Sequence, residues 1–160
     1  MSTARASFLS APRCISATIT TDQLSLAAVN QTITIDQQIP AGAIVIARYL
    51  HLITEFSGGG AGNCVVDMGD QADGNGWYNN EDVFTGAGTG IKATPELPGP
   101  YLGGDGAAGN VTRPPAADCL GPARTIEVTF TANVDVALLT AGSLGVNVFY
   151  VEQAAGDLPA

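Results

Sequence analysis

The chain has 160 residues, which is long enough for one domain with a hydrophobic core, and we expect a single domain. Only 13% of the residues are charged, and fifteen acids against six bases give a net charge of −9. This balance repels polyanions, and the bases are scattered along the chain, so we expect no nucleic-acid partner. The 20 glycines among so few charges favour an all-β domain with many turns.

The N-terminal sequence MSTARASFLSAPRC has no apolar run of the kind found in secretory signals, which predicts synthesis in a reducing cytoplasm. We expect residues 1–14, which include Arg5 and Arg13, to form an arm of flexible composition that reaches over a neighbouring subunit. Cys14, Cys64 and Cys119 fit neither a disulfide framework nor a zinc site, and we expect free, mostly buried thiols.

The first strands are expected where Thr and Ile alternate, at residues 17–21 and 31–36. A tight turn follows at Ile39-Pro40-Ala41-Gly42, with Pro40 in its second position. A long strand then runs from residue 44 to residue 56. The turn and the alternation together predict that this part of the chain is a series of antiparallel strands.

The strand at residues 44–56 is apolar on both faces. Simple alternation places Ile46 on one face with Leu50 and Leu52, and Tyr49 on the other face. Such a strand is either central or covered on its second face by another subunit. Its sequence, which includes Arg48 and is too short to cross a bilayer as a helix, predicts no membrane association.

The acidic segment MGDQADGNGWYNNEDVFTG, residues 68–86, follows a short strand at residues 64–68. A twelve-residue calcium loop aligned at Gln71 would place Asp73 in its third position, but Gln71 itself replaces the required first aspartate. A different calcium site made by Asp70, Asp73 and Asp82 stays open as an alternative. The favoured interpretation is a rigid acidic turn, because Asp, Asn and Gly are the residues that turns demand, so we predict no metal ligands.

Three further candidates for chemistry are weak. The single histidine, His51, lies between two leucines and has no nucleophile motif near it, which favours a core or interface position over catalysis. Trp77 and Tyr78 could stack on a sugar ring, although Trp77 is better explained as closing one end of the core. Glycoside cleavage by acids of the 67–82 region is a third, weaker alternative. We therefore predict no catalytic residues, no cofactor and no enzyme activity, and no binding residue is assigned.

The rest of the chain is a long loop followed by two strands. Residues 86–123 are rich in Gly and Pro, and a loop of this length predicts a contact with a partner. RTIEVTFTA (124–132) and SLGVNVFYVE (143–152) alternate clearly, and residues between them form a short strand or a turn of helix. About eight short strands predict one β-sandwich over residues 15–152, with the jelly roll as the favoured type, and a C-terminal tail at 153–160.

Several of these stretches also resemble a known class of protein. The run TITIDQQIPAGAIVIARYLHLITEFSGG, then VVDMGDQADGNGWY, IEVTFTAN and LLTAGSLGVNVFYVE, resembles small β-sandwich virion proteins of tailed bacteriophages. The resemblance covers about two-thirds of the chain, and its motifs are turns and alternation, not ligands. The long loop at residues 86–123 has no place in the pattern.

The resemblance implies a capsid decoration (cement) protein, which binds where capsomers meet and stabilises the head. It implies the major capsid protein as a partner, self-association as a homotrimer, and a location on the capsid surface of the virion. A tail or fibre component is the nearest alternative. A carbohydrate-binding module for host attachment, using Trp77 and Tyr78, is the next.

Overall fold

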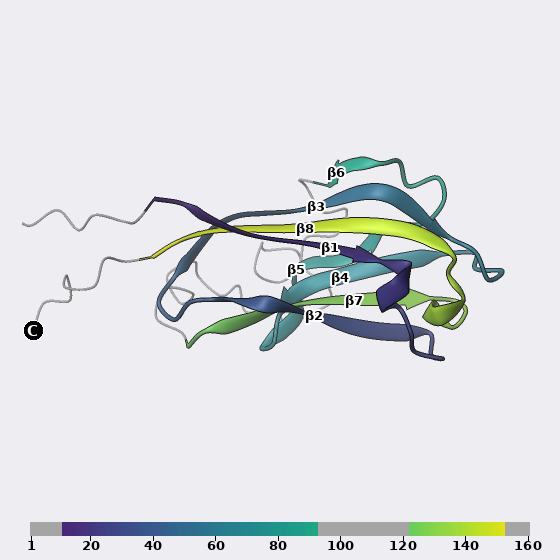
Figure 1. The fold of residues 1–160 in the computed structure, drawn as a ribbon, viewed down its shortest axis with the longest axis horizontal. Helices are drawn as coiled ribbons and strands as arrows, with labels where there is room; N and C mark the ends of the chain where they lie inside the picture. Colours follow the sequence, from purple (N-terminus) through teal and green to yellow (C-terminus); the bar gives the residue numbers. More distant parts are fainter. Residues whose placement is uncertain (1–10, 93–121, 153–160) are drawn as a thin grey trace, which may run out of the picture.

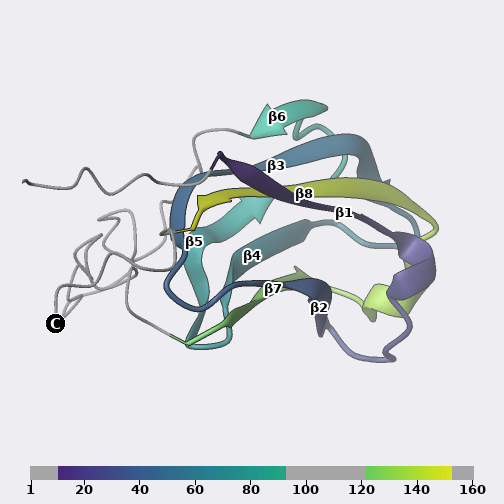
Figure 2. The same cartoon turned by 60° about the vertical axis from the view of Figure 1, so that its left-hand side comes forward.

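The computed structural model describes residues 11–92 and 122–152. These residues form two four-stranded antiparallel sheets packed face to face, as Figures 1 and 2 show. One sheet has the order β1-β8-β3-β6 and the other has the order β2-β7-β4-β5. The strands are β1 (Arg13–Thr20), β2 (Asn30–Ile39), β3 (Ile44–Ser57), β4 (Cys64–Asp70), β5 (Asp73–Asp82), β6 (Gly90–Lys92), β7 (Arg124–Ala132) and β8 (Ala141–Val151).

The strand order is that of a jelly roll. The first strand pairs with the last, the second with the seventh, the third with the sixth and the fourth with the fifth. This is a chain folded on itself as one long hairpin and then rolled, so that alternate strand pairs fall in opposite sheets. The predicted all-β fold, the β-sandwich and its jelly-roll type are confirmed.

The core lies between the two sheets and follows the predicted alternation most closely in β7 and β8. Ile126, Val128 and Phe130 of β7 are fully buried, and their neighbours in sequence are only half-buried. Phe130 meets Phe56 of the opposite sheet with ring centroids 5.1 Å apart. The segment between β7 and β8 contains a short 3-10 helix, η4 (Val136–Leu138), which is one of the two predicted forms.

Two details of the β2–β3 region differ from the prediction. The turn hydrogen bond runs from the Ala43 amide to the Pro40 carbonyl, so Pro40 is the first residue of the turn and Gly42 takes the positive φ of 74°. A β-bulge between Val45 and Ala47 then interrupts the alternation, and Ile46 is half exposed instead of facing the core with Leu50. The bulge is the physical reason why simple alternation fails at the start of β3.

The described residues also adjust the expected boundaries. β1 begins at Arg13, so residues 13 and 14 belong to the sandwich, and residues 1–10 and 153–160 lie outside the described part. The expected loop at 86–123 contains β6, which pairs with β3, and its residues 93–121 lie outside the described part. Among the described residues, no helix has the length and apolar character needed to cross a membrane.

Candidate interaction surface

The acidic segment is mostly a strand and not a turn. Gln71 and Ala72 form a turn after β4, residues 73–82 continue as β5, which pairs with β4, and a second turn follows at Thr85 and Gly86. Gly69 is required here, because a Cβ at this position would lie 1.9 Å from the Asp73 carbonyl oxygen. The prediction of an acidic turn is therefore wrong for residues 73–82. Their Gly and Asn residues fit an irregular hairpin, in which the pairing shifts register twice and Asn80 has a φ of 56°.

Asp70 is fully buried and holds the end of this hairpin. Its Oδ1 accepts hydrogen bonds from the amides of Ala72 (2.9 Å) and Asp73 (3.1 Å). Its Oδ2 lies 3.4 Å from Nη1 of Arg124, whose side chain is 8% exposed. The carboxylate therefore fixes the β4–β5 turn and the first residue of β7 at once.

A second buried acid, Glu81 of β5, lies close to Lys92 at the end of β6. Its carboxylate lies 3.7 Å from the Lys92 ammonium group, and its side chain is 1% exposed. The Tyr78 hydroxyl donates a hydrogen bond to the Lys92 carbonyl. Burial is the main cause that raises the pKa of Tyr78 to about 12, so the hydroxyl keeps its proton and stays a donor.

These contacts place both flanks of residues 93–121 on the same hairpin. Lys92 is the last described residue before this segment and is held by Glu81, whereas Arg124 starts the strand after it and is held by Asp70. The acids of the hairpin therefore have structural contacts. Within the described ranges, no group of three or more His, Cys, Asp or Glu side chains is arranged to hold a metal ion.

Trp77 and Tyr78 do not form a surface for sugars. Each is only 1% exposed, and both belong to the core. Trp77 lies in the core, as predicted, and the sugar-stacking alternative is wrong because neither ring can be reached from solvent.

The pH dependence of folding should report on Asp67. Burial raises the pKa of Asp67 above its ordinary 3.8, although the hydrogen bond from the Asn80 amide (2.7 Å) opposes this. A carboxyl group whose pKa is higher in the folded than in the unfolded protein contributes stability at pH values below its unfolded pKa. This contribution is lost as the pH rises through the pKa of the folded state. We therefore expect Asp67→Asn, which keeps an oxygen for Asn80, to raise the thermal unfolding midpoint at pH 7 and to have little effect at pH 3.

Asp22→Asn is the control, because it removes one negative charge from an exposed site in η1 (Thr21–Gln23). If the two variants raise the thermal unfolding midpoint equally at pH 7, the reduced net charge, and not the burial of Asp67, causes the increase.

The most distinctive surface is the outer side of the β1-β8-β3-β6 sheet, which we name the uncharged face. The strand register arranges its side chains in four rows across the sheet, and no row contains Asp, Glu, Lys or Arg. The rows are Cys14, Phe149 and Ala47; Ser16, Asn147 and Tyr49; Thr18, Gly145, His51 and Ile91; and Thr20, Ser143 and Thr54.

Apolar groups are exposed on and beside this face. Ile91 is 61% exposed, and the bulge residues Ile46 and Ile53 are 50% and 45% exposed. Tyr49 and Phe149 stack across β3 and β8 with ring centroids 5.9 Å apart. Because interface cores are depleted of charged residues and enriched in aromatics, this composition is typical of a surface that binds another protein.

The outer side of the other sheet is different, because it carries Asp67, Asp82 and Glu127. In a chain of net charge −9, acidic surfaces repel one another, and the uncharged face can approach another copy or an acidic partner without that cost. The two sheets therefore present chemically distinct surfaces.

The structure bears on the alternatives for β3 and His51. β3 is a central strand of its sheet, between β8 and β6, as one alternative predicted, and cover of its outer face by another subunit stays a prediction. His51 is exposed at the centre of the uncharged face, so the core position is wrong and the interface position stays a prediction. The sequence analysis missed the rest of this face. The available signal was the absence of charged residues from 14–21 and from 141–151.

The thiols differ in exposure, which gives a direct test of the packing. Cys14 is exposed and Cys64 is fully buried, so the prediction of mostly buried thiols is wrong for Cys14, whereas Cys119 lies outside the described residues. Burial, followed by the nearby charge of Asp82, raises the pKa of Cys64 to about 12.

We expect Cys64, as the sole thiol of a Cys14→Ser/Cys119→Ser variant, to react with a thiol reagent only in denaturant. Rapid reaction of the native variant would contradict this packing.

Comparison with known proteins gives a similarity in fold. No protein-family model matches the sequence, and no curated protein matches it. The structure is similar to a chain described as "Cyanophage Pam1 capsid asymmetric unit", with a TM-score of 0.55 and 16% sequence identity. The match covers 95% of this chain and 92% of that chain, so the two share their fold over almost their whole length.

Proposed function

We propose that this protein is a structural protein of a bacteriophage virion, and that it acts as a capsid decoration (cement) protein. The observation that carries the proposal is the similarity over nearly the full length of both chains to a component of a cyanophage capsid. The jelly roll is frequent among viral capsid domains, but it also occurs in lectins and cupins, so the fold alone is an analogy. The sequence resemblance to phage virion proteins supports the same assignment independently of the structure.

The uncharged face supports a role that works by contact. We propose that it binds the major capsid protein where capsomers meet, while the acidic sheet faces away and keeps the free protein soluble. Many copies that each bury on the order of 1,000 Å² would strengthen a shell through summed interfaces, without any enzymatic activity. The proposal includes a homotrimer on the capsid surface, assembled from chains made in the host cytoplasm.

Binding to purified expanded capsids tests this role. We expect saturable binding with a stoichiometry fixed by the symmetry of the shell, and an increase in the temperature at which the shells break. Absence of binding, together with immuno-labelling of tails in intact virions, would contradict the decoration role and favour the tail or fibre alternative.

A further inference from the structure

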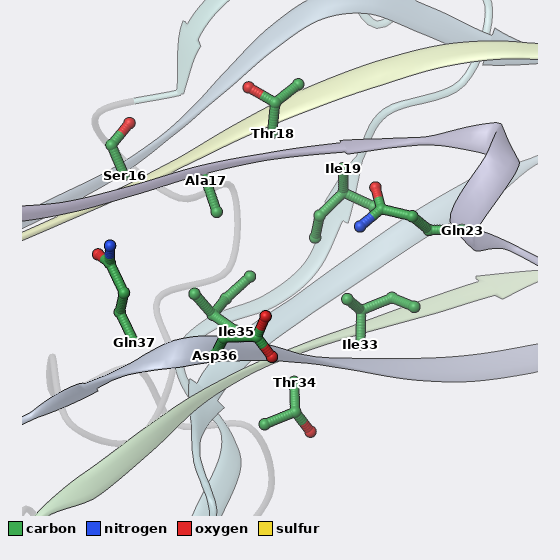
Figure 3. A pocket seen from close by; sticks show the side chains of 10 residues that line it. All are labelled: Ser16, Ala17, Thr18, Ile19, Gln23, Ile33, Thr34, Ile35, Asp36 and Gln37. Atoms are coloured by element: carbon green, nitrogen blue, oxygen red, sulfur yellow. The ribbon is translucent and has the colours of Figure 1, made fainter.

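A groove opens between the two sheets along the side of the sandwich where β1 and β2 are the edge strands (Figure 3). It has a volume of about 310 Å³. Its floor is apolar and belongs to the core or packs against it, whereas its rim is polar. The floor consists of Ala17, Ile19, Ile33 and Ile35, and Thr18 and Asp36 stand at the rim.

Over residues 14–20, the β1 edge beside this groove lacks the charges, prolines and bulges that normally protect an edge strand, although Arg13 stands at the start of β1. β1 pairs with β8 over eight consecutive residues without a bulge, and residues 14–20 contain no charge and no proline. The neighbouring edge, β2, is protected by a bulge between Ile35 and Gln38 and by Asp36. Because a regularly paired, uncharged edge presents its outer N–H and C=O groups to any extended segment, β1 can accept an additional strand.

The N-terminal sequence of the chain has the pattern that this groove requires. Thr3-Ala4-Arg5-Ala6-Ser7-Phe8 alternates polar and apolar residues, which is the signature of a half-buried strand. Residues 1–10 contain Arg5 and no acid, while the groove is lined by Asp36 and by no lysine or arginine. We propose that residues 3–8 of a second copy add to the β1 edge as a strand, with Ala4, Ala6 and Phe8 facing the apolar floor.

The connection to β1 favours a segment from another copy over the segment of the same chain. To lie beside its own β1, residues 3–8 would need a reversal within residues 9–12. Ala11 and Pro12 form no turn, and proline biases the residue before it towards extended backbone, so only residues 9 and 10 are left for the reversal. A ten-residue segment spans up to about 33 Å when extended, which is about the diameter of a small domain.

Exchange of this kind closes a ring when each copy donates its segment to the next, which agrees with the proposed homotrimer. It needs only copies of this chain, so it goes beyond the virion role and can be tested without a viral shell. The surface used is the edge of the sheet, which leaves the uncharged face open for the capsid.

Disulfide trapping between two versions of the full chain tests the proposal. Both carry Cys14→Ser and Cys119→Ser, which leaves only the buried Cys64. One version adds Ser7→Cys and the other adds Thr18→Cys, whose side chains would share the outer side of the sheet. We expect a mixed disulfide dimer after oxidation. Thr54→Cys replaces Thr18→Cys as the matched control, because it is an exposed threonine of the same sheet but β8 separates its strand from β1.

Two further results decide between the sources of the strand. A chain with both Ser7→Cys and Thr18→Cys, diluted in an excess of chains without either cysteine, should form no internal disulfide. An internal disulfide would show that the strand comes from the same chain and would overturn the proposal.

Deletion of residues 1–10 should weaken self-association at least about tenfold, which is about 1.4 kcal/mol. Its circular dichroism spectrum should match that of the full chain, so that misfolding is excluded. Unchanged self-association after the deletion, or a full chain that stays monomeric at every concentration, would overturn the proposal.

Discussion

Asp70→Ala is expected to lower the free energy of unfolding by about 3–5 kcal/mol, because it breaks a buried ion pair and leaves one charge behind. The Arg124 guanidinium group stays in a site that is 8% exposed, and the amides of Ala72 and Asp73 lose their acceptor. Urea denaturation measures the change through the midpoint at constant m-value. Asp73→Ala, at the half-buried start of β5, is the control and should cost less than about 1 kcal/mol.

The double variant Asp70→Ala/Arg124→Met separates the ion pair from the loss of side-chain packing. It removes both charges, so we expect it to be more stable than Asp70→Ala although it carries one more substitution. If the separate effects of Asp70→Ala and Arg124→Met on the free energy of unfolding simply add in the double variant, Asp70 and Arg124 are not coupled. The ion pair would then not be what stabilises this site.

The ion pairs Asp70–Arg124 and Glu81–Lys92 explain why the prediction of a turn failed for segment 68–86. The Asp, Asn and Gly residues of segment 68–86 have strong turn chemistry, and local preference alone predicts a turn. Long-range contacts override it, because burial of Trp77 and Tyr78 and the pairing of Glu81 with Lys92 hold most of the segment in β5. No pattern within the segment reveals which distant base each acid will meet.

Sequence reasoning worked where one face of a strand is buried and the register is regular. β7 shows this, because Ile126, Val128 and Phe130 had to face the core whichever strands became its neighbours. It failed at the start of β3, where a bulge moved Ile46 out of the core, because bulges depend on the pairing of strands that lie far apart in sequence. The apolar second face of β3 points outward in the single chain, and its cover by another subunit stays a prediction.

His51→Glu is expected to weaken binding to expanded capsids by about 30-fold or more, if the uncharged face is the surface that binds the shell. His51 lies at the centre of that face, with Gly145 of β8 on one side and Ile91 of β6 on the other. An interface that covers this position would bury an unpaired carboxylate, which costs about 2 kcal/mol or more. The free protein should keep its stability within about 0.5 kcal/mol, because the position is exposed in the single chain.

Two controls isolate the effect of charge at this position. His51→Gln changes the shape of the side chain without adding a negative charge and should bind nearly as well as the unmodified protein. Thr131→Glu places the same carboxylate on β7 in the opposite sheet, where the face already carries acids, and should also preserve binding. A loss of binding for Thr131→Glu but not for His51→Glu would show that the acidic sheet faces the shell. That result would reverse the proposed orientation of the protein while leaving its decoration role intact.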